Sequence, residues 1–222
     1  MTLQEKRKAE QKNVMDKRKS EAVTCAMLCF CKNGIETTAI ADIAAFAQVG
    51  EATLYRYFTT KENLVMECGI WFWKLAISYY EKTIYTREYL LKNGMEQLET
   101  LLRITETIYR EHRSKFKFLH DLDVFLLSHK VEEEKLKEYE ALVDFLRPCL
   151  VEAIEKGKED KSISFKEDTL TLYYTITHTV LSLMQKMAGM GQLLKSDTIV
   201  AEQAQISLLI KLLLEGIANN EQ

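Results

Sequence analysis

Apolar residues recur every three or four positions along most of this chain, which is the spacing that places them on one face of an α-helix. Leu98, Leu101, Leu102 and Ile108 are one example. The strict alternation of apolar and polar residues that marks a half-buried β-strand is nearly absent. A single proline and eight glycines in 222 residues leave long stretches without a helix breaker. The pattern therefore predicts an all-α protein.

The periodic segments and the breaks between them predict about nine helices. Their expected ranges are 19–34, 40–47, 51–57, 62–81, 94–113, 114–128, 132–156, 167–189 and 197–218. Pro148 lies inside the range 132–156 and should kink or restart that helix, because proline lacks a backbone N–H. The polar stretch 157–165 is the clearest loop.

Residues 37–64 predict a short helix, a tight turn, a second short helix and the start of a third. Thr38 precedes an apolar run and is the expected N-cap of the first helix. Val49 and Gly50 interrupt that run, and Gly50 would permit the sharp change of direction. Leu54 and Phe58 face inward on the second helix. The pattern is that of a helix-turn-helix DNA-binding unit, although two core helices with an aromatic plug would show the same periodicity.

The outward face of the second helix suits contact with DNA. Ala52 and Thr53 are small enough to let that face approach the floor of a major groove. The hydroxyls of Thr53, Tyr55 and Tyr57 suit phosphate oxygens.

The third helix of this segment begins with a capping signal. Thr59 and Glu62 fit a capping box, and Thr60 is a competing cap. The backbone N–H groups around Lys61 would then point outward and attract a phosphate, and its ammonium would add a positive charge.

From Lys19 to about Leu64 the chain resembles the DNA-binding domain of the TetR (tetracycline-repressor) family of bacterial transcriptional regulators. The similar segments are KSEAVTCAMLCFCKNG, TTAIADIA, the segment ending in LYRYF, and TKENL, in that order. The resemblance implies a homodimer that binds a palindromic operator in double-stranded DNA, most often as a repressor. The residues that it places at the DNA are Lys19, Thr38, Gly50, Glu51, Ala52, Thr53, Tyr55, Arg56, Tyr57 and Lys61.

Two residues depart from the pattern of that family. Many members have a serine where this chain has Gly50, and that serine usually caps the recognition helix. A basic or polar residue is common where this chain has Glu51. An acidic side chain there would repel phosphates, accept a hydrogen bond from a cytosine N4, or point away.

The charge distribution supports a DNA-binding end. The whole chain has a formal net charge of −3, but residues 1–61 hold ten basic and seven acidic side chains, a net of +3, which leaves −6 for the rest. A basic end on an acidic body suits a protein that presents that end to DNA. The segment before residue 19 either extends the first helix, reaches along a groove as a disordered arm, or is a solvated tail. We expect a DNA-binding domain at 1–64 and an effector-binding and dimerisation domain at 65–222.

The last two predicted helices carry more apolar surface than one neighbour can cover, which favours burial between subunits. The resemblance implies the same, a dimer built from these helices. The expected interface residues are Leu172, Ile176, Val180, Ile206, Leu209, Ile210, Leu213 and Ile217.

The resemblance also implies a pocket for a small-molecule effector in the helical body. The mixture of aromatic, methionine and hydroxyl side chains suggests an apolar or aromatic effector with one or two polar handles. Candidate lining residues are Trp73, Phe118, Leu122, Phe125, Tyr139, Phe145, Tyr174, His178 and Met184. Ordinary core packing is the alternative role for each of them.

Other chemistry finds little support in the sequence. The four histidines show no metal-binding spacing, and no phosphate loop or catalytic pair of carboxylates occurs, so we expect no enzyme activity, no metal and no cofactor. Five cysteines form no paired framework, which fits a reduced cytoplasm, and no apolar run is long enough to span a membrane. The alternative to a ligand-responsive DNA-binding regulator is a small-molecule binding or interaction protein of the same fold without effective DNA binding.

Overall fold

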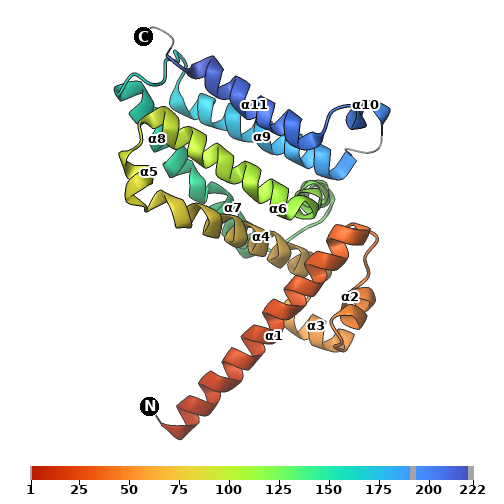
Figure 1. The fold of residues 1–222 in the computed structure, drawn as a ribbon. Coiled ribbons are helices and arrows are strands. Elements are labelled where there is room, and N and C mark those ends of the chain that lie inside the picture. Colours follow the sequence, from red (N-terminus) through yellow and green to blue (C-terminus); the bar gives the residue numbers. More distant parts are fainter. Residues whose placement is uncertain (1, 191–193, 220–222) are drawn as a thin grey trace. The chain divides into compact units, whose positions relative to one another are not determined.

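The computed structural model describes residues 2–190 and 194–219, and its elements there are helices (Figure 1). The expected all-α class is confirmed. The helices are α1 (Leu3–Asn33), α2 (Ile40–Phe46), α3 (Glu51–Phe58), α4 (Lys61–Ile84), α5 (Arg87–Leu91), α6 (Gly94–Ser128), α7 (Glu133–Val143), a 3₁₀ turn (Asp144–Leu146), α8 (Arg147–Glu159), α9 (Thr169–Met190), α10 (Lys195–Thr198) and α11 (Glu202–Ile217). None of the described helices combines the length and the apolar character that a bilayer crossing requires.

The chain divides into two compact units. The N-terminal unit is the chain up to Trp71 together with residues 121–139, and the C-terminal unit is residues 72–120 together with the chain from Glu140 onward. Helices α4, α6 and α7 each contribute to both units.

In the N-terminal unit the second half of α1 packs against α2, and α2 packs against α3. Phe30, Ile43 and Leu54 are almost completely buried in the core that these helices share. Gly69 of α4 permits a close approach, because a Cβ there would lie 2.9 Å from side-chain atoms of Leu122 and of Tyr139.

In the C-terminal unit α9 packs against both α8 and α11. Its buried face includes Leu172, Ile176 and Val180, each at most 4% exposed. The loop after α8 also holds the end of α11, because the backbone N–H of Ser164 donates to the carbonyl of Ile217 (2.9 Å).

Several expected helix boundaries differ in the structure. The ranges 94–113 and 114–128 form one helix, α6, with a kink at His112 (φ −130°, ψ 32°), so the break predicted there is present as a bend. The helix expected at 132–156 is interrupted by the 3₁₀ turn and restarts at Arg147, which puts Pro148 in the first turn, where its missing N–H costs nothing. The short helix α5 was not expected, and the single helix expected at 197–218 is wrong, because α10 ends at Thr198 and α11 begins only at Glu202.

Candidate DNA-binding surface and effector cavity

Thr38 has a different role from the one expected. Its side chain is fully buried, and its hydroxyl donates to the carbonyl of Gly34 (2.6 Å). The residue before α2 is Ala39, whose backbone N–H donates to the carboxylate of Asp42 (3.0 Å). The prediction that Thr38 caps α2 is therefore wrong, and its buried hydroxyl is not exposed for contact with DNA.

The turn between α2 and α3 depends on Gln48 rather than on Gly50. Gln48 has a φ of +55°, in the left-handed region, and its backbone N–H donates to the carbonyl of Ala45 (3.2 Å). Gly50 has an ordinary φ of −74°, and a Cβ there would meet nothing within 4 Å. The expectation that Gly50 makes the change of direction is wrong, because this position accepts any L-residue.

Helix α3 presents the outward face that the sequence predicts. Leu54 and Phe58 are buried at 1% and 4% exposure, so they fix which side of the helix faces outward. Glu51, Ala52, Tyr55 and Arg56 are exposed, and Thr53 and Tyr57 are partly exposed. The guanidinium of Arg56 lies 5.5 Å from the centre of the Tyr57 ring, a cation–π distance.

A groove of about 410 Å³ runs between α1 and the start of α3. It brings together residues from α1, from the turn and from α3, and they are Arg18, Glu21, Ala22, Cys25, Ala47, Gln48, Val49, Gly50, Thr53, Arg56 and Tyr57. Arg18 was not among the expected DNA-binding residues. Arg18 lies four residues before Ala22 and therefore on the same face of α1, and this spacing is the sequence feature that could have identified it.

The start of α4 is capped by Thr60. The hydroxyl of Thr60 accepts a hydrogen bond from the backbone N–H of Asn63 (3.2 Å), so Thr60, the competing cap, takes the role first given to Thr59. Lys61 donates to the carbonyl of Glu36 (3.2 Å), which holds its ammonium beside the loop before α2.

Lys19 is engaged inside the N-terminal unit. Its ammonium lies 2.8 Å from a carboxylate oxygen of Glu67 on α4, and the same oxygen lies 2.6 Å from the ammonium of Lys135 on α7. Burial alone would raise the pKa of Glu67, but the hydrogen bonds from Lys135 and Lys19 more than offset it, so this pKa lies below its usual value. The arrangement makes Lys19 a residue that joins α1 to α4.

Replacing Gly50 with serine should stabilise the protein slightly. The new Cβ meets no atom, and the hydroxyl can accept a hydrogen bond from the first turn of α3, which has no side-chain cap. A serine at an N-cap stabilises a helix by a few tenths of a kcal/mol more than a glycine does. Urea unfolding of Gly50→Ser and of Gly50→Ala measures the gain, and equal stability of the two variants would contradict the capping role.

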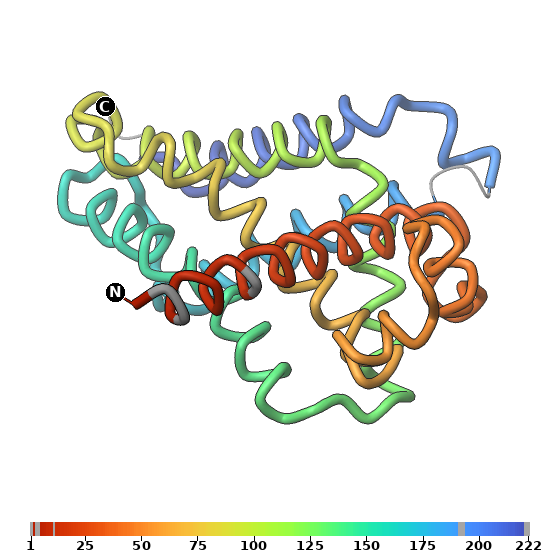
Figure 2. Tube along the Cα trace, turned by 90° about the horizontal axis from the view of Figure 1, so that it is seen from below, coloured from red at the N-terminus to blue at the C-terminus, as the bar shows by residue number. Residues whose placement is uncertain are grey.

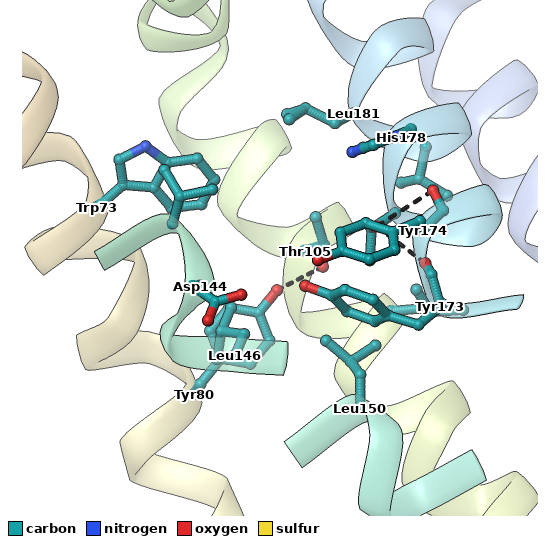
Figure 3. Close-up of a pocket in the computed structure, with 14 residues that line it drawn as sticks. Trp73, Tyr80, Thr105, Asp144, Leu146, Leu150, Tyr173, Tyr174, His178 and Leu181 are labelled. Atoms are coloured by element: carbon teal, nitrogen blue, oxygen red, sulfur yellow. Dashed lines mark hydrogen bonds between the residues drawn. The ribbon is translucent and has the colours of Figure 1, made fainter. Parts of the chain in front are cut away.

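The C-terminal unit holds a cavity of about 160 Å³. Figure 3 shows its aromatic walls, with Trp73 and Tyr80 from α4 and Tyr173 and Tyr174 from α9 around the same space. The complete lining is Trp73, Tyr80, Leu102, Thr105, Val143, Asp144, Leu146, Leu150, Tyr173, Tyr174, Thr177, His178, Val180 and Leu181.

Three of the nine expected ligand-binding residues line this cavity, namely Trp73, Tyr174 and His178. The others lie outside the lining: Phe118, Leu122, Phe125 and Met184 are at most 1% exposed, Tyr139 packs at Gly69, and Phe145 is 36% exposed. Tyr80 and Tyr173 were missed. Tyr80 follows Trp73 by seven residues, two turns along the same helix face, and that spacing is the signal that identifies it.

Several polar groups of the cavity are paired with neighbouring groups of the protein. Because the hydroxyl of Thr105 donates to the carbonyl of Leu101, the hydroxyl of Tyr80 donates to Thr105 at 2.5 Å (Figure 3). Burial raises the pKa of Tyr80 to about 12, so its hydroxyl keeps its proton. The Asp144 carboxylate lies 2.6 Å from the guanidinium of Arg147, which balances its charge.

One donor in the lining has no partner. The indole N–H of Trp73 is buried, and no hydrogen-bond acceptor reaches it in the described part of the chain. The aromatic walls and the compensated charge at Asp144 make the cavity suitable for an uncharged ring.

The surface of α9 and α11 differs from the expected interface. Leu172, Ile176, Val180, Ile206, Ile210 and Ile217 are at most 4% exposed, because α9 and α11 bury them within the chain itself. Leu209 and Leu213 are partly exposed. Leu208 and Leu212, one turn apart on α11, are 54% and 56% exposed and form an apolar patch on that helix.

Comparison with known proteins agrees with this geometry. Residues 24–68 match the family model described as bacterial regulatory proteins, tetR family. A segment of 51 residues is 45% identical to the HTH-type transcriptional regulator LuxR of Vibrio harveyi, and it spans 23% of this chain and 25% of that regulator.

Solved structures share the fold over most of the chain. The ketosteroid transcriptional regulator KstR2 of Mycobacterium tuberculosis is 21% identical, with a TM-score of 0.65 over 90% of this chain and 95% of that one. The transcriptional regulator FadR of Bacillus subtilis, in complex with stearoyl-CoA, is 15% identical, with a TM-score of 0.67 over 89% and 98%. The family match therefore covers the helix-turn-helix segment, and the solved structures show that the chain shares their fold over most of its length.

Proposed function

We propose that this chain is a ligand-responsive transcriptional regulator that binds a palindromic operator as a homodimer, most often as a repressor, and that a small molecule releases it. The observation that carries the proposal is the outward face of α3, where exposed Ala52 and partly exposed Thr53 leave room for base edges and Arg56 and the tyrosines surround them. Two such helices, one DNA turn of roughly 34–36 Å apart, would read a near-palindrome.

The cavity of the C-terminal unit would hold the effector. A volume of about 160 Å³ is close to that of an engineered cavity that holds one benzene ring, so the proposed effector is a single small ring with one polar group. The regulator FadR is solved with stearoyl-CoA, a far larger molecule, and a cavity of this size would not hold it without opening. The ligand must favour the form that does not bind DNA by a few kcal/mol.

Glu51 favours a second candidate function. Its carboxylate is exposed in the first turn of α3, the helix that we propose to face DNA phosphates. If it only repels DNA, the chain would be a ligand-binding or interaction protein of the same fold. Glu51→Gln and Glu51→Lys distinguish the roles, because a residue that reads a base changes the preferred sequence when replaced, whereas a repelling residue raises the affinity for all sequences.

Selection of bound duplexes from a random library, followed by a salt titration of the winner, tests the main proposal. We expect a palindrome to be enriched, with an affinity that falls steeply with salt. Single-ring phenols and ketones added to the complex should then release the DNA and raise the melting temperature of the free protein. A folded protein that enriches no duplex at low salt would favour the second candidate.

The dimer is proposed to form through Leu208 and Leu212. Leu212→Glu should leave the monomer folded, because Leu212 is 56% exposed, and should weaken dimerisation at least 100-fold by placing two carboxylates in an apolar interface. Sedimentation across a concentration series measures this. Leu127→Glu is the matched control, since Leu127 is 89% exposed on α6. Dimerisation that is equally strong in both variants would exclude this surface.

A further inference from the structure

The first half of α1 is a charged helix that the rest of the N-terminal unit does not cover. The described side chains from residue 5 to residue 18 are all exposed. Figures 1 and 2 show α2 and α3 beside the second half of α1 only. The helix begins at Leu3 with a capping box, in which the Thr2 hydroxyl accepts from the backbone N–H of Glu5 (3.3 Å) and the Glu5 carboxylate accepts from that of Thr2 (2.7 Å).

This segment is stable as a helix for local reasons. The packed second half of α1 supplies the nucleus, so each residue added toward the N-terminus requires only propagation. Its composition is rich in lysine, arginine, glutamate and glutamine, which are good helix formers. The segment therefore forms a helical extension of about 24 Å for residues 3–18, at 1.5 Å per residue.

The extension is basic although the chain is acidic. Residues 5–18 hold six basic and three acidic side chains, a net charge of +3, against −3 for the whole chain. The basic residues, none of which forms an ion pair in the described part of the chain, are Lys6, Arg7, Lys8, Lys12, Lys17 and Arg18. A basic surface that its own protein leaves unpaired suits a polyanion.

One face of the extension continues the groove beside α3. Positions 7, 14 and 18 follow one another at helical spacing, and positions 22 and 25 carry the same face onward. Arg18, Ala22 and Cys25 line the groove, and Thr53 and Arg56 of α3 line its other side. Arg7 and Val14 thus extend a surface that begins at the recognition helix, while Glu5 and Asp16 lie on the opposite face of α1.

We propose that this face of α1 is a second DNA-binding surface, in which Arg7 and Arg18 bind backbone phosphates of the duplex that α3 reads. The proposal rests on the proposed function, since it requires that α3 faces DNA. An extension of about 24 Å is comparable to seven base-pair steps of duplex at roughly 3.4 Å each, so each subunit would contact phosphates outside the bases read by α3. These contacts add affinity and salt dependence without base readout.

A pair of double variants tests it on the full-length protein with the duplex selected from the random library. Arg7→Gln with Arg18→Gln removes the charges of the proposed face. Lys8→Gln with Lys12→Gln removes the same number of charges from another face of the same helix. Glutamine retains helix propensity, and circular dichroism checks that all the proteins have equal helix content.

For the dimer, the arginine variant loses four phosphate contacts, so the slope of log K against log salt should become less steep by about 3 to 4. Its affinity at 0.15 M salt should fall tenfold or more, and the lysine variant should change much less. Equal losses of affinity in the two double variants would show that the wrong face of α1 has been assigned. Unchanged salt slopes would show that α1 does not contact phosphates, while operator binding by α3 would still stand. A wild-type protein that enriches no duplex would overturn the proposed function itself.

Discussion

Replacing Gly94 with alanine should destabilise the C-terminal unit by about 3 kcal/mol, the upper end of the usual cost of overpacking. A Cβ at Gly94 would collide with the backbone N and Cα of Gly157 and lie 2.5 Å from the carbonyl oxygen of Ala153. These are backbone atoms of α8, so no side chain can rotate out of the way. The first residue of α6 and the last turns of α8 must therefore move apart.

That separation would also break polar contacts. The backbone N–H of Gly94 donates to the Asp160 carboxylate (2.8 Å), and that of Met95 donates to the Ser162 hydroxyl (3.1 Å). These groups satisfy the first turn of α6, which has no partners of its own. The loop that supplies them also pairs with the end of α11, so the damage would spread across this end of the unit.

Denaturant unfolding of Gly94→Ala and Gly216→Ala at one protein concentration measures the effect. A Cβ at Gly216 meets nothing within 4 Å, so alanine there should stabilise α11 by up to about 1 kcal/mol through helix propensity. The two substitutions are chemically identical and should change the free energy of unfolding in opposite directions. A Gly94→Ala protein as stable as the wild type would show that α6 and α8 separate without cost.

The sequence was sufficient to predict the elements whose periodicity is local. Leu54 and Phe58 lie four residues apart on one face of α3, and this spacing alone predicts that both face inward, as they do. Pro148 restarts a helix because its chemistry permits only a first-turn position inside a helical run. Such features depend on residues within one or two turns of each other.

Features that depend on distant residues could not be predicted. The ammonium of Lys19 is of a kind that binds phosphate, but in the structure it pairs with Glu67, which is 48 residues away in sequence. Glycine is the residue type that a left-handed turn position favours, so the sequence points to Gly50, whereas in the structure Gln48 has the left-handed φ. In both cases the residue type is compatible with two roles, and the three-dimensional fold decides between them.

The expected dimer and ligand residues show the same limit. Periodicity identifies the apolar face of α11 but not the neighbour that buries it, so Ile206 and Ile210, which face α9, could not be separated from Leu208 and Leu212. In the same way Phe118 fills the core while Tyr80 lines the cavity. Apolar residues of similar size differ here only in whether another helix occupies the space in front of them.

Replacing Arg56 with glutamate should weaken operator binding on the order of 100-fold. Arg56 is exposed on the outward face of α3, with its guanidinium held over the Tyr57 ring at 5.5 Å. A dimer would carry the charge reversal twice, so two attractive contacts with phosphates become repulsive. Each lost contact also reduces the steepness of the salt dependence by about 0.9.

A matched control is available in the C-terminal unit. The ammonium of Lys82 lies over the Tyr79 ring at 5.0 Å, so Lys82→Glu makes the same charge reversal beside the same kind of ring, on α4 instead of α3. It should lower the affinity only through the long-range field, by a few-fold at low salt and hardly at all at 0.15 M. Arg56→Gln should fall between the wild type and Arg56→Glu.

The measurement is a fluorescence-anisotropy titration of the selected duplex with all four proteins, at two salt concentrations and with matched circular dichroism spectra. Because α3 has only eight residues and Arg56 lies in its last turn, glutamate there also loses a favourable interaction with the helix dipole, worth about 0.5 kcal/mol. That loss is far smaller than a 100-fold change, which is about 2.7 kcal/mol. If Arg56→Glu and Lys82→Glu bind equally well, α3 does not face the DNA, and the operator must be read by another surface.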